Sequence, residues 1–194
     1  MPIVDMKARL RDTMRARRSA FGREAAHGEA IAGNFMDVAQ DLGISPGKVI
    51  AGYWPIGAEA DVRPLLAKVS AIGATCVLPV IGGQDQALCF RQWQPGDELE
   101  DAALGTRQPT ADKPWGIPDF VLAPLLAFDG RGYRLGQGGG YYDRTLAELQ
   151  TGADVVSIGI AYSCQQVDKV PHSAHDRRLD WIVTEKVVIK VGEE

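Results

Sequence analysis

A glycine-rich run late in the chain carries residue types that bind phosphate. It reads Arg134-Leu-Gly-Gln-Gly-Gly-Gly-Tyr-Tyr-Asp143 and lies between an apolar segment and a helical pattern. Glycines let backbone N–H groups approach an anion, and the first N–H groups of a helix attract phosphate. Arg134 offers a planar cation for phosphate oxygens, and Asp143 in the first helical turn is placed to hold Mg²⁺. The run therefore predicts a phosphate-binding turn.

This run differs from the common nucleotide-binding motifs. It has no Gly-Lys-[Ser/Thr], as a Walker A loop would, and it comes too late for the dinucleotide Gly-x-Gly-x-x-Gly. A tight connection between strand and helix, without a ligand, is the alternative interpretation. Four glycines in five positions between arginine and aspartate favour the anion site.

Cations in the first helical segment could complete such a site. Lys7, Arg11, Arg15 and Arg18 follow helical spacing and line one face. Alone, such a pattern is more typical of a solvated basic face. Together with the glycine turn, Lys7 and Arg11 become candidates for phosphate contacts, whereas Arg15 and Arg18 are expected at the surface.

Other candidate residues have two interpretations each. Trp54, at a strand end, could contact a flat ligand or belong to the core, and Glu59 lies in a loop where exposure is the default. Cys164 is expected to be a packed thiol rather than a nucleophile. The segment 172–176 holds two histidines and an aspartate, but its spacing fits no zinc motif.

Composition limits the classes of protein to consider. The 194 residues are 45% hydrophobic and 24% charged, which is ordinary for a globular domain. A net charge of −4 gives no basic field for nucleic acid or anionic membrane, and the longest apolar run is too short to span a bilayer. Three separated cysteines argue against a disulfide framework, so reduced, mostly buried thiols are expected. We expect a cytoplasmic protein; a mitochondrial transit peptide is the weaker alternative, because Asp5 and Asp12 interrupt the basic start.

The elements that must position these residues alternate between helix and strand. We expect an α/β, three-layer fold with a largely parallel open sheet and helices on both faces, as a single domain over 1–194. Within it, N-terminal helices over 5–41 pack on an α/β core over 48–192. The expected helices are 5–21, 24–41, 61–71 and 140–151, and the expected strands are 48–54, 74–81, 86–93, 119–128, 154–162 and 186–191. The stretch 94–118 is expected to be irregular and functional.

The glycine run in its longer context resembles the 5-formyltetrahydrofolate cyclo-ligase family. The resemblance is carried by Phe128-Asp129-x-x-Gly132-x-Arg134-Leu135-Gly136-x-Gly138-x-Gly140-Tyr141-Tyr142-Asp143. Three further matches span nearly the whole chain, and they are Lys7-x-x-Leu10-Arg11, Tyr53 with Glu59, and His175-Asp176 followed by Leu179-Asp180 and Thr184-Glu185. Departures from the family's pattern occur at Gln108, Ser173 and Gly139.

The resemblance implies a role for each matching residue. The catalytic residues would be Lys7 and Arg134. The ATP-binding set would be Lys7, Arg11, Arg134, Leu135, Gly136, Gln137, Gly138, Gly139, Gly140, Tyr141 and Tyr142. The folate-binding set would be Trp54, Glu59, Gln137, Gly138, Gly139, Gly140 and Tyr141. Mg²⁺ would be held by Asp143 and Asp176.

The implied reaction converts ATP and 5-formyltetrahydrofolate into ADP, phosphate and 5,10-methenyltetrahydrofolate. The γ-phosphoryl group would activate the formyl oxygen, and N10 of the folate would then close the ring. The partners would be small molecules, with neither nucleic acid nor membrane, and the chain would be a monomer. Alternative functions are a phosphotransferase with another acceptor, a non-catalytic nucleotide or folate binder, and, least favoured, a nucleic-acid binder.

Overall fold

The computed structural model describes residues 2–22, 24–83, 85–174 and 176–192. A seven-stranded sheet lies at the centre of the fold. The strand order is β11-β10-β9-β6-β1-β2-β3, and the pairs from β10 to β2 are all parallel. Only the edge strands β3 and β11 run antiparallel to their neighbours. The strands are β1 Val49–Ala51, β2 Thr75–Val80, β3 Cys89–Gln92, β6 Phe120–Pro124, β9 Val156–Ile160, β10 Trp181–Val183 and β11 Val188–Lys190.

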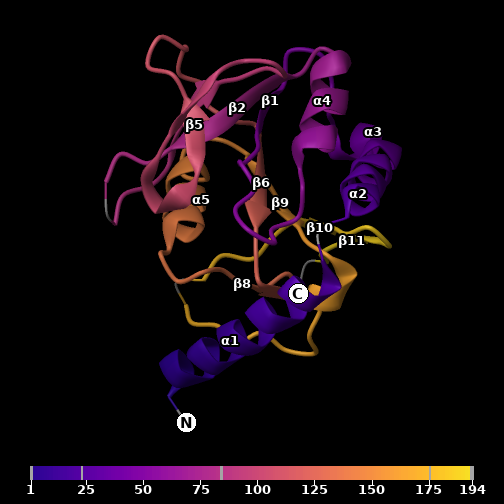
Figure 1. The fold of residues 1–194 in the computed structure, drawn as a ribbon, viewed down its shortest axis with the longest axis vertical. Helices are drawn as coiled ribbons and strands as arrows, with labels where there is room; N and C mark the ends of the chain where they lie inside the picture. Colours follow the sequence, from indigo (N-terminus) through magenta and orange to yellow (C-terminus); the bar gives the residue numbers. More distant parts are fainter. Residues whose placement is uncertain (1, 23, 84, 175, 193–194) are drawn as a thin grey trace.

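Helices cover both faces of this sheet, which confirms the predicted three-layer α/β fold (Figure 1). Consecutive side chains of β1 enter different apolar cores. Ile50 packs with residues of α2 (Ala25–Asp37) and α4 (Arg63–Ala71), whereas Ala51 packs with Leu146 of α5 (Tyr141–Leu149). Because side chains alternate across a strand, one sheet can feed two apolar layers.

Helix α1 (Ile3–Phe21) does not cover a sheet face but lies across the end of the fold, next to β8 (Figure 1). Its Met14 is fully buried against Leu126, Leu135 and Val170. The second predicted helix, 24–41, is two helices, because the chain leaves helical geometry at Val38 (φ −109°, ψ 6°) before α3 (Ala39–Leu42).

The predicted strand 119–128 is also two elements, and this correction matters for the site. After β6 ends at Pro124, the chain leaves the main sheet and forms a separate hairpin of β7 (Ala127–Phe128) and β8 (Arg134–Leu135). The apolar run is continuous because both parts are buried, so periodicity gave no sign of the break. The hairpin delivers Arg134 and the glycine turn to the carboxyl end of β6. The short strand β10 lies at 181–183, where the sequence analysis expected no strand.

The segment 94–118 is more regular than expected. It contains an antiparallel hairpin of β4 (Leu99–Asp101) and β5 (Arg107–Pro109), joined by the short helix η1 (Ala103–Gly105). Leu104 in that turn has a left-handed backbone (φ 62°, ψ 16°) and is 68% exposed.

The cysteines and the hydropathy of the helices bear on two further expectations. All three cysteines are free, but only Cys76 is buried, Cys164 is half-buried and Cys89 is exposed. The prediction of mostly buried thiols was therefore wrong for Cys89. Among the described residues, no helix is both long enough and apolar enough to cross a bilayer.

Candidate active site

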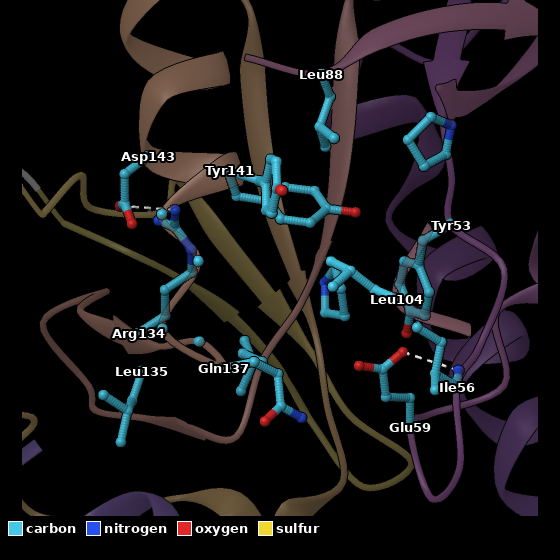
Figure 2. Close-up of a pocket in the computed structure, with 18 of the residues that line it drawn as sticks. Tyr53, Ile56, Glu59, Leu88, Leu104, Arg134, Leu135, Gln137, Tyr141 and Asp143 are labelled. Atoms are coloured by element: carbon cyan, nitrogen blue, oxygen red, sulfur yellow. Dashed lines mark hydrogen bonds and ion pairs between the residues drawn. The ribbon is translucent and has the colours of Figure 1, made fainter. Parts of the chain in front are cut away.

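A cavity of about 320 Å³ lies beyond the carboxyl ends of β1, β2 and β6, where ligands bind in parallel α/β sheets. Residues that lie far apart in the sequence meet in it (Figure 2). The predicted site residues that line it are Lys7, Arg11, Trp54, Glu59, Arg134, Leu135, Gly136, Gln137, Gly138, Gly139, Gly140, Tyr141, Tyr142, Asp143 and Asp176. The structure thus brings together every residue that the sequence analysis assigned to the site.

The glycine turn adopts a backbone that requires glycine at two positions. Gly138 and Gly140 have φ values of 112° and 66°, in the left-handed region that side chains disfavour. Gly140 is also the N-cap of α5 and, having no side chain, leaves the first amides of that helix without a side-chain cap. These amides and the helix dipole favour an anion beside the turn.

Two arginine side chains of helix α1 contact the glycine turn. Arg11 donates from Nε to the Gly136 carbonyl oxygen at 3.0 Å, and its guanidinium lies against Gly138. Arg15 donates from Nε and Nη2 to Oε1 of Gln137, both at 3.1 Å. Arg15 is exposed, as predicted, yet it contacts the turn.

Two ion pairs form the charged end of the cavity. Lys7 Nζ lies 2.6 Å from Oδ2 of Asp176, and Arg134 Nη2 lies 2.8 Å from Oδ1 of Asp143. Arg134 also donates to the Arg177 carbonyl oxygen at 2.8 Å, which fixes its guanidinium plane. Each pair joins a cation suited to phosphate with a carboxylate suited to a metal ion.

Burial and neighbouring charges shift the pKa values of these groups in opposite directions. Burial lowers the pKa of Arg134, and the Asp143 and Asp176 carboxylates oppose that change. For Asp176, burial alone would raise the pKa, but hydrogen bonds from Lys7 and Ser173 outweigh it, so the pKa is lowered. Ser173, a departure from the family pattern, contributes through its Oγ at 2.8 Å from Asp176.

The opposite end of the cavity is apolar around one buried carboxylate. Glu59 is only 7% exposed, which overturns the default of an exposed loop residue, and its Oε2 accepts a hydrogen bond from the Ile56 amide at 3.0 Å. Figure 2 shows Glu59 and Tyr53 across the cavity from Arg134 and Asp143, with Gln137 between the two sides. Apolar lining comes from Ile56, Pro79, Ile81, Leu88, Leu104, Pro124 and Leu125.

Trp54 lines this cavity and, half-buried, packs against the core. It packs edge-on against Trp93, with ring centroids 6.0 Å apart, and the Arg63 guanidinium lies 5.5 Å from its ring. Its packing against the core is thus observed, and its contact with a ligand stays a prediction. Ile56, Leu88 and Leu104 were missed because a single apolar residue in a loop or short strand gives no sequence signal of a cavity wall.

One cation was misplaced by the sequence analysis. Arg18 was expected at the surface, but it is only 6% exposed. It follows Met14 by four residues and therefore shares the buried face of α1. The spacing of Leu10, Met14 and Phe21 contained this signal, but the run of charges masked it.

The acidic residues of the cavity fit a magnesium ion better than a zinc ion. Asp143 and Asp176 both line the cavity, and Mg²⁺ is commonly held by one or two carboxylates together with phosphate oxygens and water. Across the described ranges, no three His, Cys, Asp or Glu side chains are grouped to hold a metal by themselves. His175, named in the resemblance, lies outside the described residues.

The structure also places Gln108 and Gly139, the other two residues that depart from the family's pattern. Gln108 donates to Oε1 of Glu100 at 2.8 Å across the β4–β5 hairpin, on an exposed surface. Gly139 lies in the turn, where an added Cβ would come within 2.9 Å of the Tyr141 ring. Gly139 therefore allows Tyr141 to pack against the turn.

The fold and the cavity define an α/β protein with a ligand site at the carboxyl edge of a parallel sheet. Residues 3–185 match the model of the 5-formyltetrahydrofolate cyclo-ligase family. The chain belongs to this family, and it is accordingly an enzyme of the ligase class.

Relatives and solved structures support this assignment over most of the chain. A 5-formyltetrahydrofolate cyclo-ligase from Mycolicibacterium smegmatis is 32% identical, covering 93% of this chain and 94% of the relative. The Escherichia coli K12 enzyme of the same name is 34% identical over 70% of this chain and 76% of its own. The structure of an Aquifex aeolicus 5,10-methenyltetrahydrofolate synthetase superposes with a TM-score of 0.77 at 29% identity, covering 97% of this chain and 94% of that one.

Proposed function

We propose that the chain couples the cleavage of ATP to the closure of 5-formyltetrahydrofolate into 5,10-methenyltetrahydrofolate, releasing ADP and phosphate. One observation carries this proposal: a single cavity joins a charged end, suited to phosphate, to an apolar end with a buried carboxylate. Such an arrangement suits two ligands of different chemistry that must react with each other.

The charged end would bind and position the phosphates of ATP. Lys7, Arg11 and Arg134 supply three cations from two elements, and the amides at the start of α5 add donors. In the first step, the formyl oxygen attacks the γ-phosphorus and ADP leaves. Phosphoryl transfer needs mainly positioning and charge neutralisation, which these cations provide.

The apolar end would hold the folate ring. Glu59 offers carboxylate oxygens for the N–H groups on the amidine-like edge of a pterin, and Trp54 offers an aromatic surface. In the second step, folate N10 attacks the activated formyl carbon, phosphate leaves with the former formyl oxygen, and the N10 proton is lost.

Asp143 and Asp176 would hold a magnesium ion at the charged end. When bound, Mg²⁺ neutralises charge on the β- and γ-phosphates. Binding would release Lys7 and Arg134 from their present carboxylate partners, so that both cations could turn to phosphate oxygens.

The test is a coupled assay with purified protein, ATP, Mg²⁺ and 5-formyltetrahydrofolate. We expect the absorbance of methenyl-folate to grow only with all components present, with one ADP released for each methenyl-folate formed. ATP turnover that is indifferent to folate would instead indicate a phosphotransferase with another acceptor. Binding of both ligands without product would indicate a non-catalytic binder. Either result would overturn the proposal.

A further inference from the structure

The peptide that joins Gly139 to Gly140 is a flexible point in the glycine turn. Both residues line the cavity, and Gly140 has a left-handed backbone (φ 66°) as the N-cap of α5. Glycine adopts positive and negative φ values with similar ease, so a peptide between two glycines is restricted less than one between other residues. A turn that presents this peptide to an anion in one orientation therefore needs a contact that holds it.

Arg144 makes such a contact from outside the cavity. Its Nη2 donates to the Gly139 carbonyl oxygen at 2.6 Å, and its Nη1 lies 2.6 Å from the place where a Cβ on Gly140 would be. Hydrogen bonds from a charged donor are stronger than those between neutral groups. Both glycines line the cavity, whereas Arg144 does not. The guanidinium therefore packs on the outer side of the turn.

The guanidinium of Arg144 is itself held in place. Its Nε donates to the Gln86 carbonyl oxygen at 3.3 Å, and its central carbon lies 5.2 Å from the centre of the Tyr141 ring. The side chain is 32% exposed, with Oδ1 of Asp85 3.9 Å from Nη1. A planar guanidinium can donate to two carbonyls at once in fixed directions, which an ammonium group cannot reproduce. Arg144 thus joins the glycine turn to the segment before β3.

Fixing the Gly139 carbonyl also fixes the Gly140 amide. In a planar trans peptide the C=O and N–H groups point in opposite directions, so the Gly140 amide is directed away from Arg144. Within the described part of the chain, no backbone oxygen accepts a hydrogen bond from this amide. It lies next to the first amides of α5, where the helix dipole attracts anions. The held peptide therefore adds a donor of defined direction at the start of α5.

We propose that Arg144 is a positioning residue for the nucleotide: by holding the Gly139 carbonyl outward, it keeps the Gly140 amide directed at a phosphate group of ATP. The amide makes the contact, and Arg144 acts through it. Donors that are already oriented need no rearrangement when the charged group arrives. This inference rests on the proposed function, because it assigns the turn to ATP.

The first test compares Arg144→Met and Arg144→Lys, with Arg9→Met as the control at an exposed position of α1. Methionine keeps most of the side-chain length but has no donor, whereas lysine keeps the charge. We expect the ATP KM of Arg144→Met to rise about tenfold, the effect of one charged hydrogen bond, while the folate KM stays within about twofold. Arg144→Lys should remain impaired by about fivefold, because it lacks the planar fork. Arg9→Met should match the unmodified chain.

Salt separates the position of the peptide from the charge of Arg144. At 1 M salt the screening length falls to about 3 Å, so an effect of the charge on ATP would fade. A held peptide predicts that the ratio of ATP KM values, Arg144→Met over the unmodified chain, stays constant with salt. A ratio that falls toward one, full recovery by Arg144→Lys, or an equal rise of the folate and ATP KM values would overturn the inference.

A second test observes the peptide without any substrate. NMR relaxation dispersion of the Gly140 amide should show more exchange on the microsecond to millisecond scale in Arg144→Met than in the unmodified chain. Equal exchange in both proteins would contradict the proposal. If Arg144→Met does not fold, Arg144→Lys supplies both readouts. Failure of the proposed function would look different, since the unmodified chain would then form no methenyl-folate while the NMR comparison would still report on the peptide.

Discussion

At the scale of single residues, two cations of the cavity are already paired with two of its carboxylates. Arg134 pairs with Asp143, and Lys7 pairs with Asp176. If the two cations pair with phosphate and the two carboxylates bind a metal ion, these charges stay balanced when the ligands bind. A nucleotide without metal would leave the carboxylates facing phosphate, so the pairs favour joint binding of ATP and Mg²⁺.

Asp143→Asn tests the metal-binding role directly. We expect kcat to fall by at least about 100-fold, comparable to the removal of one group that stabilises charge in a transition state. The folate KM should change little, because Asp143 lies at the end of the cavity away from Glu59 (Figure 2). Steady-state assays over a range of Mg²⁺ concentrations would measure both. Asp154→Asn, on an exposed loop, is the matched control, and a variant as active as this control would remove Asp143 from the metal site.

The ion pair of Lys7 with Asp176 should make stability depend on pH. The pKa of Asp176 is lowered in the folded state, so the pair stabilises the fold above the unfolded carboxylate pKa of about 4. This contribution is lost as the pH falls through the lower, folded pKa. The side chains are 16% and 18% exposed, so we expect about 1 kcal/mol near neutral pH.

Urea unfolding of the unmodified chain and of Lys7→Met, from neutral pH down to about pH 3, would measure this difference. The gap in unfolding free energy should shrink below about pH 4. Asp119 and Asp129 also have lowered pKa values, but they occur in both proteins and cancel. Lys169→Met, at an exposed position, should show no gap. A gap for Lys7→Met that stays constant with pH would contradict the role of Asp176 in it.

At the scale of elements, sequence patterns predicted those parts whose signals are local. The apolar runs gave the buried strands and the glycine turn gave the start of α5, because both depend on neighbouring residues. The exit of the chain at Pro124 and the burial of Arg18 depend on contacts with distant segments. The same applies to Glu59, whose burial follows from the packing of its loop against Tyr162. Patterns along the chain do not encode such contacts.

The β4–β5 hairpin brings Leu104 to the cavity in a conformation that leucine disfavours. Asparagine tolerates a left-handed backbone better, so Leu104→Asn should leave the melting temperature equal or raise it, with a gain of up to about 1 kcal/mol. If Leu104 covers the folate, the lost apolar contact should raise the folate KM roughly fivefold, equivalent to about 1 kcal/mol. Calorimetry and steady-state kinetics give the two readouts.

Ile117→Asn provides the control for that variant. Ile117 is 78% exposed and does not line the cavity, so its folate KM should match the unmodified chain. A folate KM that is unchanged in Leu104→Asn as well would mean that the hairpin does not cover the ligand.

At the scale of the whole molecule, the cations of the site are concentrated while the chain as a whole is acidic. The net charge is −4, yet Lys7, Arg11 and Arg134 converge on one cavity through α1 and β8. This arrangement requires α1 to cross the end of the sheet rather than cover a face. A nucleotide would therefore meet its cations only in the assembled fold, and ligand binding should stabilise that assembly.

The edges of the sheet support the expectation of a monomer. Beside β3, the Gln92 amide donates to the Pro114 carbonyl oxygen at 2.8 Å, and the Gly116 amide donates to the Phe90 carbonyl oxygen at 3.0 Å. The chain therefore already occupies that edge, and Pro114 brings no donor of its own. The other edge strand, β11, has three residues and ends in Lys190, a short and charged edge that discourages strand pairing.

We expect sedimentation equilibrium to give a single species of 20.9 kDa across the micromolar range. Trp115 and Ile117 could contradict this prediction by forming a dimer contact, because they are 58% and 78% exposed next to the covered edge. Because isolated exposed apolar residues are common on monomers, Ile117→Glu should leave the mass unchanged. A mass that rises with concentration in the unmodified chain, and falls to the monomer value in Ile117→Glu, would show that this edge is a dimer interface instead.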